Sequence, residues 1–107
     1  MWLVDTGLAD AGFSAQESTL NAAGITLDKT RVERGVGGGG ATDEIPFIAP
    51  EVSLGPIRER NVAGSFSGEF PLPKLLGFRV DGLVSHTFLK PYAVTFDFDR
   101  MRLCFLR

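Results

Sequence analysis

The stretch that decides the fold is residues 2–7 (WLVDTG), an apolar run that ends in an acid and a turn. Residues 2–4 are apolar and predict a buried strand. Asp5 follows directly, and a carboxylate at the end of such a strand is costly unless a partner or a substrate uses it. Thr6 offers a hydroxyl that can hydrogen-bond across a turn, and Gly7 lets the backbone reverse. The stretch therefore predicts one carboxylate aimed at a partner or a substrate.

Composition predicts one small globular domain, since the chain has 107 residues and 44% of them are hydrophobic. The net charge of -2 gives no reason to expect a nucleic-acid partner. No apolar stretch approaches the length of a membrane span, and a signal peptide is not recognisable, so we expect no membrane partner. The cell compartment is not fixed, but the chain as given favours the cytoplasm. Cys104 is the only cysteine, so an internal disulfide is excluded.

β-forming residues separated by frequent turn residues predict a mostly β domain. Strands are expected at residues 2–4, 25–27, 30–36, 42–48, 51–54, 58–66, 80–84, 93–98 and 101–106, and a loop at residues 67–77. A helix is expected over residues 15–23, where Ser14 and Glu17 form a capping box and Gly24 ends the helix. A second short helix is expected at residues 85–89.

Four consecutive glycines, Gly37, Gly38, Gly39 and Gly40, predict the mobile tip of a hairpin. Glycine loses more conformational freedom on ordering than any other residue, and four of them carry no packing information. A phosphate-binding loop is excluded because no Lys-Ser/Thr pair follows and no helix begins there. The return strand contains Pro46, which suits an edge position.

Three parts of the chain together resemble the bacterial retropepsin-like aspartic proteases, the single-domain relatives of retroviral proteases. Residues 3–7 (LVDTG) resemble the active-site turn of that family, and residues 35–38 (GVGG) lie where the family has its glycine-rich flap. Residues 80–89 (VDGLVSHTFL), followed by 94–98 (VTFDF) and 102–103 (RL), are similar to the family's ending. Order and spacing agree over nearly the whole chain.

The resemblance implies a small closed β-barrel-like retropepsin fold with one or two short helices, as a single domain over residues 1–107. It implies that Asp5, Thr6 and Gly7 form the catalytic turn and that Gly37, Gly38 and Gly39 belong to a substrate-binding flap. The implied activity is that of an aspartic endopeptidase acting on peptide or protein substrates, without a cofactor or a metal.

Hydrolysis by this route needs two carboxylates around one water, one ionised and one protonated. The chain offers one carboxylate in such a turn, so the second is expected from another copy. A symmetric homodimer places the same residue opposite itself, and two Asp5 side chains would meet at the two-fold axis. Asp81 precedes the apolar pair of its segment and does not follow it, so we interpret it as a structural turn residue.

Departures from the family pattern leave a second hypothesis open. Leu8 stands where the family has a small residue, Ala9 lacks a hydroxyl or carboxylate, and Ser85 replaces a glycine. The chain also begins after the family's first strand and could be a fragment that folds only with a lost segment. The alternative is a catalytically impaired retropepsin-like module for dimerisation or peptide binding.

Other chemistries lack the residues that they need. His86 is the sole histidine and has no cluster of Cys, His or acids at ligand spacing, which argues against a metal site. Ser14 and Ser85 have no basis as nucleophiles, because a Ser-His-Asp pattern cannot be drawn around that histidine.

Overall fold

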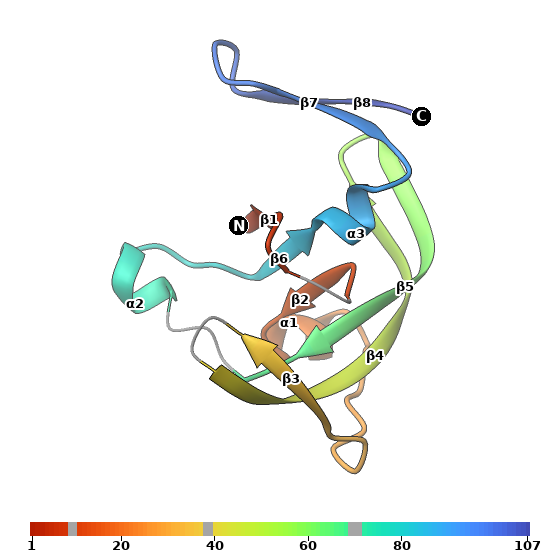
Figure 1. The fold of residues 1–107 in the computed structure, drawn as a ribbon, viewed down its shortest axis with the longest axis vertical. Coiled ribbons are helices and arrows are strands. Elements are labelled where there is room, and N and C mark those ends of the chain that lie inside the picture. Colours follow the sequence, from red (N-terminus) through yellow and green to blue (C-terminus); the bar gives the residue numbers. More distant parts are fainter. Residues whose placement is uncertain (9–10, 38–39, 69–71) are drawn as a thin grey trace.

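A six-stranded sheet that curls into a half-barrel is the main feature of the fold (Figure 1). The computed structural model describes residues 1–8, 11–37, 40–68 and 72–107. The strand order is β1-β6-β2-β5-β4-β3, with bounds β1 Trp2–Asp5, β2 Phe13–Ala15, β3 Glu33–Gly37, β4 Gly40–Leu54, β5 Ile57–Phe66 and β6 Gly82–Ser85. The mostly β prediction is confirmed. The described strands do not form the expected closed barrel, because β1 and β3 stand at opposite ends of this order.

Strands from opposite ends of the sequence pair at the β1 edge of the sheet. β1 runs parallel to β6, with Leu3 opposite Leu83 and Asp5 opposite Ser85. β2 lies between β6 and β5, antiparallel to the first and parallel to the second. The strand that carries Asp5 is therefore an edge strand.

A long meander forms the other half of the sheet. β3 and β4 pair from Glu33 opposite Glu44 to Gly37 opposite Gly40, which confirms the predicted glycine hairpin; Gly38 and Gly39 lie outside the described residues. β4 then continues to Leu54 and pairs with β5. Pro46 pairs with Ser65 of β5, two residues beyond Glu44, the last β4 residue with a described β3 partner. β4 lies between β5 and β3, so it is not the edge strand that the proline suggested.

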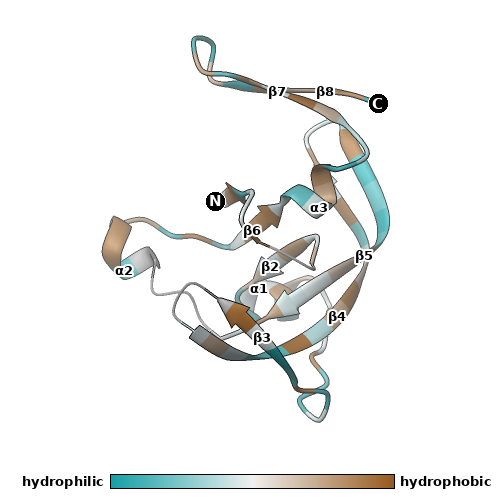
Figure 2. Ribbon diagram, viewed as in Figure 1, coloured by the Kyte–Doolittle hydropathy of each residue, from teal (hydrophilic) through white to brown (hydrophobic). Residues whose placement is uncertain are grey.

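The C-terminal hairpin forms a separate two-stranded sheet, with β7 Ala93–Asp97 and β8 Arg102–Leu106, as predicted. It projects from the half-barrel (Figure 1), and apolar residues continue along it (Figure 2). Arg107, directly after β8, connects the hairpin to β5. Its guanidinium donates a hydrogen bond of 2.6 Å to the Glu59 carboxylate, and its Cζ atom lies 5.1 Å from the centroid of the Tyr92 ring. Val94 and Phe105 pack against the core of the half-barrel, whereas Phe98, Met101 and Leu106 are exposed.

Three short helices occur in the described residues, one more than the upper limit expected: α1 Glu17–Ala22, α2 Leu72–Leu76 and α3 His86–Leu89. The capping-box prediction is wrong, because Ser14 belongs to β2 and Gln16 is the N-cap of α1, without a side-chain cap bond. Gly24 ends this helix as predicted, with a φ of 76° that suits glycine. The strand expected at residues 25–27 is not formed, and α2 replaces part of the predicted loop.

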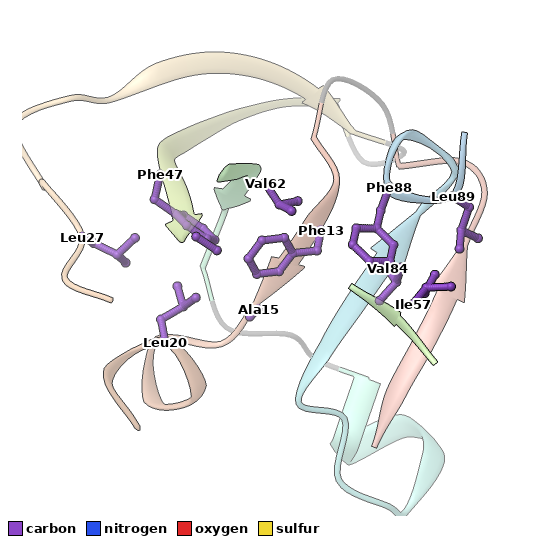
Figure 3. Packing of buried hydrophobic residues seen from close by; sticks show 11 residues of the cluster. Phe13, Ala15, Leu20, Leu27, Phe47, Ile57, Val62, Val84, Phe88 and Leu89 are labelled. Carbon is purple, nitrogen blue, oxygen red and sulfur yellow. The ribbon is translucent and has the colours of Figure 1, made fainter. Parts of the chain in front are cut away.

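The core lies inside the curl of the sheet, with Phe13 at its centre (Figure 3). Phe13 meets Phe47 edge-on at a ring-centroid distance of 5.2 Å. Gly64 leaves room for this pair, because a Cβ there would lie 2.4 Å from the Phe47 ring. Among the described residues, none of the helices has the length and apolarity to cross a membrane.

Candidate active site

Asp5 ends β1, and its carboxylate is held by the turn that follows. Its Oδ1 atom accepts a hydrogen bond of 2.9 Å from the Gly7 N–H, and its carbonyl accepts one of 3.3 Å from the Leu8 N–H. A Cβ at Gly7 would lie 3.3 Å from that carboxylate oxygen, so glycine allows this close approach. In the described part of the chain, Asp5 makes no ion pair. The turn presents a half-buried carboxylate without a cationic partner, while Thr6 and Gly7 are exposed.

Ser85 is fully buried beside Asp5 and joins three segments. Its hydroxyl donates a hydrogen bond to the Ala11 carbonyl and accepts one of 3.0 Å from the Thr87 N–H at the start of α3. Its own N–H donates to the Gly12 carbonyl at 2.9 Å. A serine at a helix N-cap is a recognisable sequence signal, although this role was not predicted. The residue that departs from the family pattern therefore supports the segment that follows the Asp5 turn.

A cavity of about 240 Å³ lies between the β3–β4 hairpin, β5 and Ala11. Its walls combine charged, polar and apolar residues: Arg31, Glu33, Glu44, Ser65, Pro46, Phe47, Ile48, Ala63 and Gly64. Ala11 is the residue whose carbonyl Ser85 binds, so the cavity adjoins the segment that leads away from Asp5. Sequence reasoning did not identify this cavity, because its walls come from distant parts of the chain.

The predicted site residues fall into two groups in the fold. Asp5, Thr6 and Gly7 share one turn, whereas Gly37 ends β3 and Gly38 and Gly39 lie outside the described residues. Among the described residues, Asp5 makes no hydrogen bond to a second carboxyl group. The Asp5 turn of one subunit thus supplies a single carboxyl group.

Asp81 has structural partners, but it lies directly before β6 and not in the turn that the sequence suggested. The N-terminal amine and the Arg79 guanidinium both pair with its carboxylate. The hydrogen bond from the amine, with a further contribution from Arg79, lowers the pKa of Asp81 below its usual value. No group of three or more His, Cys, Asp or Glu side chains in the described ranges could hold a metal ion.

No protein-family model and no curated protein matches the sequence of this chain. The structure is similar to the crystal structure of a retropepsin-like aspartic protease from Rickettsia conorii, with a TM-score of 0.62 and 17% sequence identity. The match covers 95% of this chain and 69% of that chain. At this identity the likeness shows the fold, which is retropepsin-like.

Proposed function

We propose that this chain is an aspartic endopeptidase, which hydrolyses peptide bonds through a water held between the Asp5 carboxylates of two identical subunits. The observation that carries the proposal is the position of Asp5. It stands in a glycine turn at the end of an edge strand, in a fold similar to that of a retropepsin-like aspartic protease.

The chemistry follows from bringing two such acids together. Two carboxylates about 4 Å apart repel each other by about 4 kcal/mol at an effective dielectric constant of about 20. The pair therefore keeps one proton and titrates as a unit. The ionised member takes a proton from the water, and the protonated member polarises the scissile carbonyl.

Exposed apolar side chains are the evidence that supports a homodimer. On the projecting hairpin, Phe98, Met101 and Leu106 are 80%, 85% and 73% exposed. A two-stranded hairpin is marginally stable in water by itself, and apolar surface of this kind is typical of an interaction site. A second copy that packs against the hairpin would bury these side chains. In β1, Val4 is exposed as well.

The shape and exposure of the β3–β4 hairpin suit the role of a flap. Its paired part reaches Gly37 and Gly40, and Val36 near this end is 88% exposed. A hairpin that closes over an extended peptide excludes water and adds main-chain hydrogen bonds to the substrate. We assign Gly37, Gly38 and Gly39 to this flap.

The experiment is the Asp5→Asn variant, with Asp99→Asn as the control that removes a charge from the exposed turn of the C-terminal hairpin. We expect Asp5→Asn to abolish cleavage of an unbiased peptide library while the dimer mass in sedimentation stays unchanged. Asp99→Asn should cleave normally. Retained cleavage by Asp5→Asn, or full activity in a monomer, would refute the proposal. A wild-type chain that binds peptides without cleaving them would favour the impaired module instead.

A further inference from the structure

We propose that the 240 Å³ cavity is a substrate subsite for a basic side chain, and that Glu44 is the residue that selects it. The inference rests on the proposed peptidase function and names its substrate class: peptides with a lysine or arginine near the scissile bond.

The place of the cavity fits a subsite. It lies between the proposed flap, which contributes Glu33 and Glu44, and β5, which contributes Ala63 and Ser65. Ala11 connects it to the Asp5 side of the fold through the Ser85 hydrogen bond. Pockets for drug-sized ligands measure about 300–1,000 Å³, so this smaller space suits one amino-acid side chain.

The Glu44 carboxylate is fixed in place by its neighbours. Its two oxygens accept hydrogen bonds from the Thr42 hydroxyl at 3.3 Å and the Ser65 hydroxyl at 3.0 Å. It also fills the space above Gly35, where a Cβ would lie 2.3 Å from Glu44 Oε1. The two hydroxyl groups are neutral, so they define the position of the Glu44 side chain without pairing it with a cation.

The charges around the cavity favour a cation. Glu33 and Glu44 are direct partners in the antiparallel β3–β4 pairing, and like charges directly opposite each other are destabilising. In the described part of the chain, neither acid makes an ion pair, and Arg31 on the same wall makes none either. The lining thus carries two acids and one base, and a bound cation would relieve the repulsion between the acids.

The rest of the wall matches the stem of such a side chain. Pro46, Phe47 and Ile48 provide apolar surface beside the carboxylates. Lysine and arginine have a long aliphatic stem and a charged tip, and they bury the stem along apolar surface. A neutral side chain would fill the apolar part of the cavity without compensating the charge of Glu44. An acidic side chain would add to the repulsion between Glu33 and Glu44.

The test compares matched peptides with the full chain. Sequences that the wild-type chain binds are taken from a peptide library and remade in pairs, with arginine or its neutral isostere citrulline at each position in turn. Binding is measured by fluorescence anisotropy in the Asp5→Asn background, so turnover is not needed, and cleavage is measured with Asp5 intact. We expect roughly tenfold tighter binding of the arginine peptide at one position or more, since a charged hydrogen bond is lost in its citrulline partner.

Glu44→Gln should remove most of this preference. Asp43→Asn is the matched control, because it removes the same charge from the next residue, whose side chain is exposed and is not part of the cavity wall. Gly35→Ala provides an independent variant: its methyl group displaces the Glu44 carboxylate while the charge stays, so the preference should again fall.

The outcomes separate this inference from the proposed function. A preference that Glu44→Gln removes and Asp43→Asn keeps supports the subsite, even if the wild-type chain cleaves nothing and the peptidase proposal fails. Equal binding of both peptides, or a preference that Glu44→Gln leaves intact, overturns the subsite even where cleavage is efficient. A preference for acidic peptides that Arg31→Gln removes would overturn it as well.

Discussion

Asp5 and Ser85 are direct partners in the parallel pairing of β1 with β6, so the candidate catalytic acid lies beside a fully buried hydroxyl. That hydroxyl binds the Ala11 carbonyl and caps α3. A serine distant in the sequence therefore lies beside Asp5 and holds the Ala11–Gly12 segment, where the family that the sequence resembles has a glycine.

Ser85→Ala should lower the free energy of unfolding by about 1–3 kcal/mol, because it leaves a buried carbonyl without its donor and a helix without its cap. Urea unfolding measures the loss. Ser18→Ala is the control, since Ser18 is exposed in α1 and should change the stability by less than about 0.5 kcal/mol. Equal effects of the two variants would contradict the structural role of Ser85.

The projecting hairpin should hold the dimer together. Phe98→Ser combined with Met101→Ser should raise the dimer dissociation constant at least about tenfold, since burial of a large apolar side chain contributes about 1.5–3 kcal/mol. Sedimentation equilibrium measures this constant. Leu75→Ser removes a similar side chain, 75% exposed, from α2 and should leave the constant unchanged. An unchanged constant in the double variant would place the dimer contact elsewhere.

Gly64→Ala should destabilise the core by about 1–3 kcal/mol, because its methyl group would meet the Phe47 ring and force it to move. Gly35→Ala is the informative contrast. Its methyl group meets the tip of the Glu44 side chain, which can turn away, so the free energy of unfolding should fall by less than for Gly64→Ala. Thermal unfolding compares the two, and the opposite order would contradict the packing described for Phe47.

Tyr92 is the only tyrosine, so its titration can be followed directly by ultraviolet absorbance. Its hydroxyl donates to the Glu59 carboxylate, and this bond, with desolvation, raises the pKa of Tyr92 above its usual value near 10. The neutral form is favoured in the fold, so this stabilisation is present below about pH 10 and is lost as the pH rises through the folded pKa.

Glu59→Gln should bring the pKa of Tyr92 down toward 10. Glu51→Gln is the control: it changes a carboxylate that pairs with Arg58, and it should leave the pKa of Tyr92 unchanged. A titration that is the same in wild type and Glu59→Gln would show that the hydrogen bond at the base of the hairpin is absent in solution.

Local signals predicted the hairpins and the Asp5 turn. Gly37 and Gly40 mark the end of one hairpin, and Asp99-Arg100 mark the turn of the other, because short-range turn chemistry and alternation decide such elements. The turn after Asp5 was predictable for the same reason. These features need no knowledge of distant segments.

Pairing between distant segments overturned the other local signals. Ser14 and Glu17 suggested a helix cap, but Ser14 pairs with Leu83 on one side and Ser65 on the other, and sheet pairing on both sides outweighs one cap. Residues 67–77 were expected to be a loop because of their prolines. Pro73 is the second residue of α2, and proline is compatible with the first turn of a helix.

Sequence alone could not reveal the role assigned to Glu44. In the sequence it is an ordinary acid on a hairpin strand. Only the β3–β4 register places it opposite Glu33, and only the curl of the sheet brings Arg31 and Gly64 to the same cavity. Such a site depends on tertiary structure and leaves no spacing pattern.

Mixed dimers test the central claim most directly. Wild-type subunits are mixed with increasing amounts of Asp5→Asn at constant total concentration, allowed to exchange, and assayed for peptide cleavage. If each site needs two Asp5 carboxylates, activity follows the square of the wild-type fraction and falls to about one quarter at an equal mixture. Activity that falls only to about one half would mean that each subunit works alone, and it would contradict the shared site.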